Sequence, residues 1–469
     1  MIDLTIEEII KATRGRLFNP GANLKEKIEG VSVDSRSLVE KNLFVPLEGE
    51  RVDGHKFIRE AIEKKANAVL VSKEKVSFIN FNRPLLVPII LVQDTKTALV
   101  DLAKWWRKEF KGITIALTGS NGKTTTKDMI ASVLSQKYEV AKSAKSYNTL
   151  IGVPLTIFEL NSQSKVLVTE LGMNQPGEIG FLTQLVQPDF GLVTNIGPAH
   201  LEAFGSLEKI AQAKFELVDN LKEDKTAILN IDDQFCQKRK EIEKRKVITF
   251  GVKTFADFKA DGVRMNDNGE VSFSINHKIS VNLKLLGEHN VYNALSAFAV
   301  GELLFVPREK IKEALENYQP QHLRMELLEM DGIKIINDSY NSNPASMDSA
   351  LKTLKEIKTS GRKIAVLGDM LELGEQAEKL HKEVGEKVFQ KQVDLLLTVG
   401  ELASSIVQGA LNSGMKKNKV FSFKDNQEAS FYLKENLKKG DLVLVKGSRR
   451  MKMEEIVSDL MDLYKVRRG

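Results

Sequence analysis

The stretch "ALTGSNGKTTTKD", residues 116–128, decides how this chain folds. It joins an apolar segment typical of a buried strand, "ITIALTG", to a segment with the apolar stripe of a helix, "KTTTKDMIASVLSQ". The usual nucleotide-binding loop, G-x-x-x-x-G-K-[ST], needs a glycine five residues before the second glycine. Leu117 stands there instead, and Gly119 makes the spacing G-x-x-G-K-T. The stretch is therefore either a chance match or a shortened variant of the phosphate-binding loop.

The position of this loop favours nucleotide binding. Backbone N–H groups at a helix N-terminus cradle phosphate, a lysine neutralises the β and γ oxygens, and a following threonine ligates Mg²⁺. The alternative is a glycine-rich turn with an ordinary capping role. Lys-Thr directly after the second glycine favours ATP and Mg²⁺. The residues that we expect to contact the nucleotide here are Gly119, Ser120, Asn121, Gly122, Lys123, Thr124 and Thr125.

Outward from this loop, strand and helix patterns alternate along the chain. A length of 469 residues is too great for one hydrophobic core. We expect an α/β protein of three domains: a small α/β domain over residues 1–95, a central domain over 96–321 and a Rossmann-like domain over 322–469. The central domain is predicted to resemble a P-loop ATPase, with a mostly parallel sheet and a small antiparallel addition that turns at Asn268-Gly269.

Composition narrows the class of protein. The chain is 42% hydrophobic and 28% charged, and its net charge of +6 arises from 69 basic and 63 acidic residues. Such a near balance is not typical of nucleic-acid binding. The single cysteine, Cys236, excludes an internal disulfide framework. The N-terminus is unlike a signal peptide, and no apolar run approaches the roughly 20 residues that span a bilayer. We expect a cytoplasmic protein that binds neither nucleic acid nor membrane.

Polar residues follow several of the predicted strands at their carboxyl ends. In open parallel sheets, ligands bind just beyond those ends. A carboxylate or histidine at such a place is often only solvated or structural, but beside a phosphate-binding loop it becomes a candidate metal ligand. The residues at or just after a strand end are Gly119, Glu170, His200, Asp338, Asp369 and Lys446.

Lys214 lies where the apolar stripe of the segment "SLEKIAQAKFELVDNL" calls for a buried residue. A lysine there either extends its amine outward to water or stays buried. Burial lowers the pKa of an amine, and a neutral amine is able to combine with CO₂ to form a carbamate. Helix geometry alone leaves both alternatives open.

Three further stretches are polar enough to bind a ligand, although each also has a purely structural explanation. "LGEHNVYNALSA" places Asn290 and Asn293 one turn apart at a helix start, which suits a nucleotide or an ordinary cap. "INDSYNSNPASM" gathers Asp338, Asn341 and Asn343 before a proline-initiated helix. "DSR" near the N-terminus, with Ser35 and Arg36, is either an anion site or a turn.

Taken together, these residues resemble the Mur ligases, the ATP-dependent amide-forming enzymes of peptidoglycan synthesis, over essentially the whole chain. That family uses the loop T-G-[ST]-N-G-K-T, which Thr118 to Thr124 match, so the resemblance explains the missing glycine. It implies that Thr124 and Glu170 hold one Mg²⁺, and that His200 and a carbamylated Lys214 place a second. It also implies a set of residues that hold ATP from two domains: Asn290, Asn293, Arg324 and Asp338.

"DSYNSNP" resembles the family member that adds D-alanyl-D-alanine to UDP-N-acetylmuramoyl-tripeptide through an acyl phosphate. The resemblance implies a monomer whose last domain closes over the site and whose first domain grips the UDP end through Ser35 and Arg36. One departure is "SYNTLIGVP", where Thr149 follows Asn148 in place of a second asparagine. Both are still expected to bind substrate, and the dipeptide is expected near Asn341, Asn343 and Asp369. The alternatives are a folylpolyglutamate synthetase-like ligase and a non-catalytic P-loop regulator.

Overall fold

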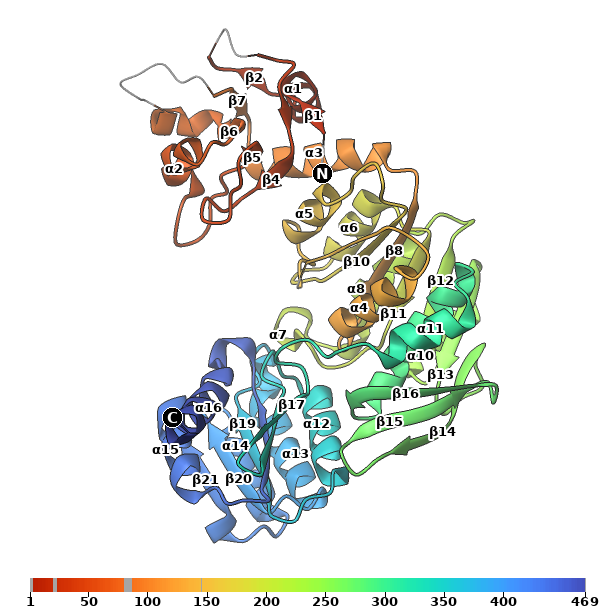
Figure 1. The fold of residues 1–469 in the computed structure, drawn as a ribbon, viewed down its shortest axis with the longest axis vertical. Coiled ribbons are helices and arrows are strands. Elements are labelled where there is room, and N and C mark those ends of the chain that lie inside the picture. The colour runs from red at the N-terminus through yellow and green to blue at the C-terminus, as the bar shows by residue number, and fades with distance from the viewer. Residues whose placement is uncertain (1–2, 20–22, 80–86, 145, 469) are drawn as a thin grey trace.

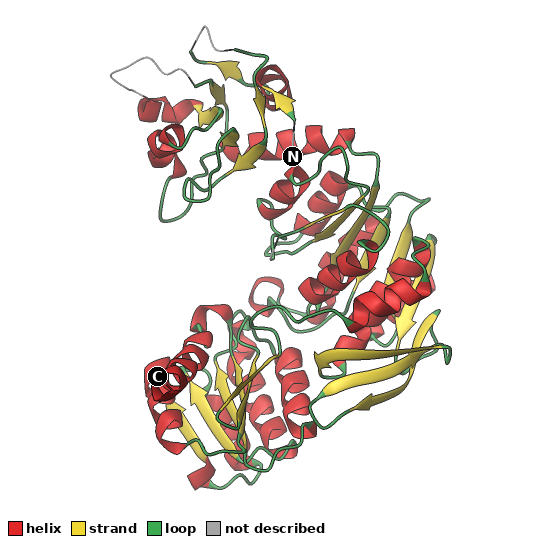
Figure 2. Ribbon diagram, viewed as in Figure 1, coloured by secondary structure: helices red, strands yellow, loops and turns green. Residues whose placement is uncertain are grey.

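The computed structural model describes residues 3–19, 23–79, 87–144 and 146–468. Its N-terminal, central and C-terminal parts follow one another along a curve (Figure 1). Each part holds a sheet with helices packed beside it (Figure 2). The prediction of a three-part α/β fold with mostly parallel sheets is confirmed. No helix among the described residues is long and apolar enough to cross a membrane.

The N-terminal part contains a five-stranded sheet and a two-stranded ribbon. The sheet runs in the order β2 (Arg16–Leu17), β7 (Ile89–Val92), β6 (Ala68–Ser72), β5 (Asn42–Phe44), β4 (Gly30–Ser32), and the ribbon pairs β1 (Leu4–Thr5) with β3 (Lys27–Ile28). The helices are α1 (Ile6–Thr13), η1 (Gly54–Phe57), α2 (Ile58–Glu63), η2 (Lys73–Ile79) and α3 (Thr95–Glu109). Thr5 and Glu8 form a capping box that starts α1. Helix α3 packs against α1 and against α5 of the central part, so it connects the two.

The central part is a nine-stranded sheet. Its order is β16 (Ile279–Leu286), β15 (Glu270–Ile275), β14 (Phe258–Met265), β13 (Lys246–Gly251), β12 (Thr226–Asn230), β11 (Phe190–Val193), β8 (Ile113–Thr118), β10 (Val166–Glu170), β9 (Val140–Lys142). Strands β8 to β14 pair in parallel, whereas β14, β15 and β16 are antiparallel and give the predicted addition. Strand β8 lies between β10 and β11, so the segments that follow these three strands meet at one edge of the sheet.

Helices surround this sheet because each carries an apolar face. They are α4 (Lys123–Leu134), α5 (Gly152–Phe158), α6 (Glu178–Val186), α7 (Leu201–Phe204), α8 (Leu207–Asp219), α9 (Gln234–Ile242), α10 (His289–Leu303) and α11 (Arg308–Glu316). Helix α10 packs along α4, and their buried residues share one core with the strands.

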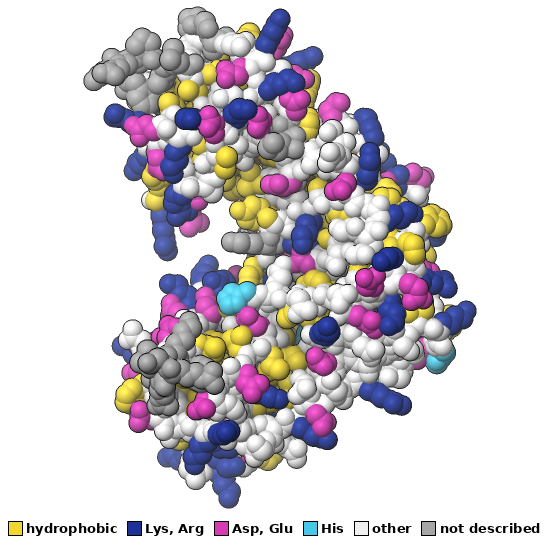
Figure 3. All heavy atoms as spheres, in the orientation of Figure 1, with side chains coloured by type: hydrophobic (Ala, Val, Ile, Leu, Met, Phe, Trp, Pro, Cys, Tyr) yellow, Lys and Arg dark blue, Asp and Glu magenta, His cyan; other side chains and the backbone are white. Residues whose placement is uncertain are grey.

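The C-terminal part is a six-stranded sheet that is parallel except for its edge strand β17. Its order is β17 (Glu326–Met330), β18 (Ile333–Asn337), β22 (Leu442–Lys446), β19 (Lys363–Gly368), β20 (Leu395–Val399), β21 (Val420–Phe423). The helices are α12 (Pro344–Glu356), η3 (Gly374–Gln376), α13 (Ala377–Gln390), α14 (Ser404–Asn412), η4 (Lys417–Lys419), α15 (Asn426–Asn436), η5 (Arg449–Met451) and α16 (Glu454–Arg468). In the space-filling view the molecule is hollowed on one side, between the N-terminal and C-terminal parts (Figure 3).

Candidate active site

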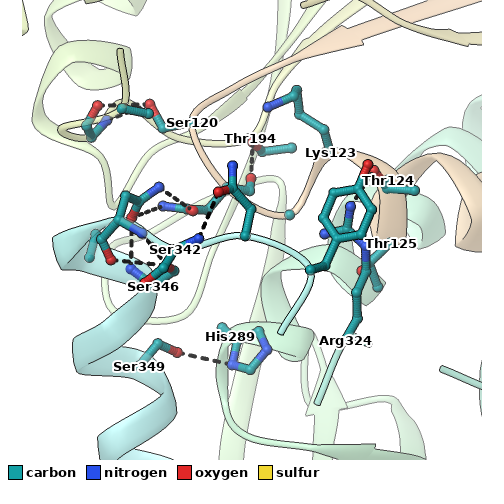
Figure 4. A pocket seen from close by; sticks show the side chains of 18 of the residues that line it. Ser120, Lys123, Thr124, Thr125, Thr194, His289, Arg324, Ser342, Ser346 and Ser349 are labelled. Carbon is teal, nitrogen blue, oxygen red and sulfur yellow. Dashed lines mark hydrogen bonds between the residues drawn. The ribbon is translucent and has the colours of Figure 1, made fainter. Parts of the chain in front are cut away.

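The shortened loop between β8 and α4 has a backbone that only glycine adopts easily. Gly119 has φ 150° and Gly122 has φ 79°, both in the region where a Cβ is disfavoured. A Cβ on Gly119 would lie 1.9 Å from Thr194 Oγ1, and one on Gly122 would lie 2.5 Å from Asn293 Oδ1. The loop is therefore packed closely against Thr194, directly after β11, and against α10. Figure 4 shows Ser120, Lys123, Thr124 and Thr125 of this region around the cavity.

Thr124 and Glu170 form the centre of a polar cluster at the start of α4. The Thr124 hydroxyl donates to Glu170 Oε2 at 2.9 Å, while Asn148 Nδ2 donates to the other carboxylate oxygen at 2.6 Å. Arg324 Nη2 donates to Thr124 Oγ1 at 3.0 Å and reaches it from the segment that enters the C-terminal part. A hydroxyl and a carboxylate this close are the hard oxygen donors that Mg²⁺ prefers, so these residues fit the ion.

Two lysines lie close to this cluster with their charge disfavoured by burial. Lys123 Nζ donates to Gly119 O at 2.9 Å, and burial lowers the pKa of its amine. Lys214 lies on α8 with only 2% of its surface exposed, so of the two alternatives that the sequence left open the structure shows the buried one. Burial, together with the positive charge of Lys123, lowers the pKa of Lys214 well below its usual value, and Glu170 offsets part of this effect. A neutral amine at Lys214 is nucleophilic.

His200 faces the C-terminal part. It has φ 60°, a left-handed backbone that is uncommon for histidine, and it directly precedes α7. Its Nδ1 lies 2.7 Å from Glu372 Oε2, and this contact lowers the pKa of the Glu372 carboxyl. In the described part of the chain, no three His, Cys, Asp or Glu side chains are grouped as metal ligands.

The start of α10 forms another wall of the cavity. Asn293 Nδ2 donates to Asn290 Oδ1 at 2.9 Å, and its own Oδ1 accepts from Thr126 at 3.1 Å. His289 Nδ1 lies 3.0 Å from Ser349 Oγ on α12, which Figure 4 marks with a dashed line. Burial lowers the pKa of the His289 imidazole. The amides thus brace the helix against α4, and the histidine brings it against the C-terminal part.

The C-terminal part supplies charged and amide groups to the same cavity. Lys446 Nζ donates to Asp338 Oδ2 at 2.6 Å and to Asn341 O at 3.0 Å. Asn343 Nδ2 donates to Asn121 Oδ1 at 2.8 Å, directly across to the phosphate loop. These contacts join the edges of two sheets around one cavity of about 770 Å³.

Tyr340 connects the C-terminal part to Ser146, which lies beside Thr124. Its hydroxyl donates to Ser146 Oγ at 2.6 Å, and its ring lies 4.0 Å from the Arg324 guanidinium. Sequence reasoning did not single out Ser146, Asn195 or Glu372, although all three line the cavity. Asn195 follows β11 in the same way as Glu170 ends β10, so the rule about strand ends could have found it. Nothing in the spacing signals Ser146 or Glu372, because each meets its partner only through tertiary contacts.

Other residues that we expected at the site lie apart from this cavity. Ser35 donates to Glu60 at 3.0 Å in the N-terminal part, and the Arg36 guanidinium pairs with its neighbour Asp34. Thr149 accepts from Gly152 N at the start of α5. The Asp369 carboxylate accepts from Ala403 N at 2.7 Å, and burial raises the pKa of this carboxyl. The other predicted nucleotide and metal residues line the cavity, with the exception of Gly119 and Lys214.

Family models match most of the chain. The model described as Mur ligase family, catalytic domain, matches residues 27–107. The Mur ligase middle domain matches residues 117–301, and the Mur ligase glutamate ligase domain matches residues 323–449. The three matches follow one another in chain order, as the three sheets do.

Individual relatives are similar over nearly their whole length. The UDP-N-acetylmuramoyl-tripeptide–D-alanyl-D-alanine ligase of Bacillus subtilis (strain 168) is 39% identical, over 98% of this chain and 99% of the relative. A crystal structure of MurF from Acinetobacter baumannii has a TM-score of 0.87 at 29% identity, covering 98% of this chain and 99% of that one. MurF ligase from Thermotoga maritima, solved in complex with ADP, has a TM-score of 0.80 at 28% identity, covering 93% and 98%.

Proposed function

Because this chain belongs to the Mur ligase family, we propose that it joins D-alanyl-D-alanine to UDP-N-acetylmuramoyl-tripeptide and converts ATP to ADP and phosphate. The observation that carries the proposal is one cavity in which Thr124, Glu170 and Arg324 meet at the phosphate loop, with Lys446 and Asp338 opposite. The full-length similarity to ligases of that name supports the choice of substrates. Neither the folylpolyglutamate alternative nor the non-catalytic regulator has such support.

The first step activates a carboxylate, which is a poor acyl donor. An oxygen of the tripeptide's terminal carboxylate attacks the γ-phosphorus of ATP, the bond to the β-phosphate oxygen breaks, and ADP leaves. The backbone of Gly119 to Lys123 holds the phosphates, and the Lys123 amine stabilises the charge on the transferring group. Mg²⁺, bound by the Thr124 hydroxyl and the Glu170 carboxylate, would supply further neutralisation of phosphate charge when present. Arg324 is placed to contact the same phosphates from the linker.

The second step forms the amide. The amine of D-alanyl-D-alanine attacks the acyl carbon, the bond from carbon to the phosphate oxygen breaks, and phosphate and one proton leave. The acyl phosphate hydrolyses if water reaches it, so the meeting of the central and C-terminal parts around the cavity serves to exclude water. Asn341 and Asn343 would lie beside the dipeptide. Asp369, directly after β19, would also contribute to dipeptide binding. Asn148 and Thr149 would bind the tripeptide end.

Lys214 supports a second metal position. We propose that its neutral amine adds to CO₂, losing a proton to form a carbamate that, with His200, would hold a second Mg²⁺ beside the substrate carboxylate. The burial of Lys214 and the lowered pKa of its amine support this modification. In the structure His200 contacts Glu372, so to hold a Mg²⁺ it would have to bind the ion beside Glu372 or release that contact.

The remaining predictions complete the proposal. The N-terminal part would grip the UDP end through Ser35 and Arg36, and Asn290, Asn293, Arg324 and Asp338 would hold ATP from both sides of the cavity. From the family resemblance, we propose a monomer in the cytoplasm that acts on small molecules and binds neither nucleic acid nor membrane.

The deciding experiment measures phosphate release from Mg-ATP together with the mass of the product. One reaction contains UDP-N-acetylmuramoyl-tripeptide and D-alanyl-D-alanine; the other contains tetrahydrofolate and glutamate. Mass gain of the dipeptide in the first reaction only is expected. Turnover in the second reaction alone, or nucleotide binding without turnover in either, would contradict the proposal.

A further inference from the structure

The segment between α11 and β17, residues 317–325, runs beside α4 and carries Arg324. We call it the linker. It contacts the helix at two points. Gln321 Nε2 donates to the Asp128 carboxylate, and Arg324 Nη2 donates to Thr124 Oγ1. Asp128 lies four residues after Thr124, so both helix residues lie on the same face of α4. Two points of contact fix the direction of the linker as well as its position.

The two contacts are connected through a tight turn of the linker backbone. Arg324 N donates to Gln321 O at 3.2 Å, which holds these two residues together. A shift of Gln321 away from α4 therefore moves the start of the Arg324 side chain as well. The Arg324 guanidinium would then no longer be placed to contact Thr124, or a phosphate bound at the same position.

Asp128 is itself held firmly and is able to serve as an anchor. It is buried with 5% of its surface exposed, and its Oδ1 accepts from Lys142 Nζ at 2.8 Å. Lys127 Nζ lies 3.6 Å from the same oxygen. The neighbouring lysines thus hold one carboxylate oxygen in place, and the other oxygen is directed to Gln321.

The linker borders a second cavity at this point. Asp128, Lys142, Tyr318 and Gln321 border a cavity of about 390 Å³. The Tyr318 hydroxyl is buried and has no hydrogen-bond partner among the described residues. A chain segment beside such a space is not held by close packing alone. The bond from Gln321 to Asp128 is therefore one of the two specific contacts that hold the linker on α4, beside that of Arg324 with Thr124.

We propose that Asp128 and Gln321 are positioning residues that hold the linker on α4 so that Arg324 meets the nucleotide phosphates at Thr124. This inference rests on the proposed function for the role of Arg324. It assigns a part in nucleotide affinity to Asp128, one helical turn along α4 from Thr124, and to its partner Gln321.

The test uses the full-length chain and three changes at this contact. Gln321→Ala removes the donor, and Gln321→Glu places two carboxylates against each other. The double variant Asp128→Asn, Gln321→Glu exchanges donor and acceptor and restores a hydrogen bond. Gln319→Ala is the matched control, because Gln319 is an exposed residue of the same linker whose side chain, within the described part of the chain, bonds to Asn317 O at 3.4 Å.

Affinity for Mg-ADP, KM for ATP and kcat are measured for each variant, with the melting temperature as a check on folding. We expect Gln321→Ala to weaken ADP binding about tenfold, and Gln321→Glu about thirtyfold, with kcat at saturating ATP changed by about twofold or less. The double variant is expected to return to within about threefold of the native affinity. The control is expected to match the native chain.

The proposal is overturned if Gln321→Ala binds ADP like the control, or if the double variant is no better than Gln321→Glu. A lower melting temperature with unchanged ADP affinity would also overturn it, because the contact would then be merely structural. ADP affinity does not depend on the acceptor substrates. If the native chain fails to make the peptide product while the affinities follow the expected order, the positioning role stands and the proposed function fails.

Discussion

The central and C-terminal sides of the cavity hold their polar groups in different ways. On the central side, Thr124, Glu170 and Asn148 bond to one another, and the loop glycines are packed against β11 and α10. On the C-terminal side, Asn343 and Tyr340 bond across to Asn121 and Ser146 of the other part. The central groups are held mainly by bonds within their own part, whereas Asn343 and Tyr340 meet their partners only when the two parts come together. Substitutions on the central side should therefore lower the rate of the chemical step. Substitutions on the C-terminal side should weaken the contact between the two parts around the cavity.

The largest effect is expected from Lys123→Ala. Loss of a positive charge aimed at the transferring phosphoryl group should lower kcat roughly a thousandfold. Phosphate release in the presence of both substrates measures this loss. Lys111→Ala, an exposed lysine just before β8, is the matched control and should keep native activity. A Lys123→Ala variant with kcat within about tenfold of native would show that the loop lysine does not act on the phosphoryl group.

Lys214→Ala should lower activity at least about a hundredfold, because the carbamate oxygens would be lost. Short carboxylic acids added to this variant should restore part of the activity by occupying the vacated space. Lys209→Ala is the control, since Lys209 lies exposed on the same helix. Mass spectrometry and ¹³CO₂ labelling of the native chain test the modification directly. Full activity of Lys214→Ala would rule out the carbamate.

On the C-terminal side, Asn343→Ser tests the contact between the two parts separately from the stability of helix α12. Asn343 caps α12 through Ser346 N and also pairs with Asn121. Serine still caps a helix, but it is too short to form the amide pair. We expect KM for ATP to rise about threefold to fivefold, as for one modest hydrogen bond, with an unchanged melting temperature. Asn343→Ala should lose the cap too, at a cost of about 1 kcal/mol in unfolding free energy. Equal melting temperatures for the two variants would contradict this division of roles.

The smallest effect concerns the contact between His200 and Glu372, which also joins the two sides. The bond to His200 lowers the pKa of Glu372, so the folded state favours the ionised carboxylate. The stabilisation is therefore present above the usual glutamate pKa of about 4.3 and is lost as pH falls through the lowered value. Glu372→Gln should remove this acid dependence and little else. Acid unfolding curves of the two chains should converge at low pH; parallel curves would show that the pair does not contribute.

Sequence alone was sufficient for the phosphate loop and for the alternation of strands and helices, because these depend on local periodicity and on residues close together in the chain. It left two alternatives for Lys214, and the structure decided for burial. The sequence also indicated that Glu170, His200, Asp338 and Lys446 lie at carboxyl ends of strands. Which strand ends meet depends on the order of strands in the sheets, and β8 lies between β10 and β11 only through long-range pairing. Spacing does not encode that order.

The tertiary structure decided the contacts that make these residues one site. Arg324 meets Thr124, and Asn343 meets Asn121, because two sheets place their edges around one cavity. It also separated Asp369 and Thr149 from that cavity: Asp369 bonds to Ala403 N after the neighbouring strand β20, and Thr149 bonds within its own loop. Sequence periodicity indicates whether a side chain faces a core or solvent. The partner that it finds across a cavity is set by the packing of whole domains, in which residues more than 200 positions apart become neighbours.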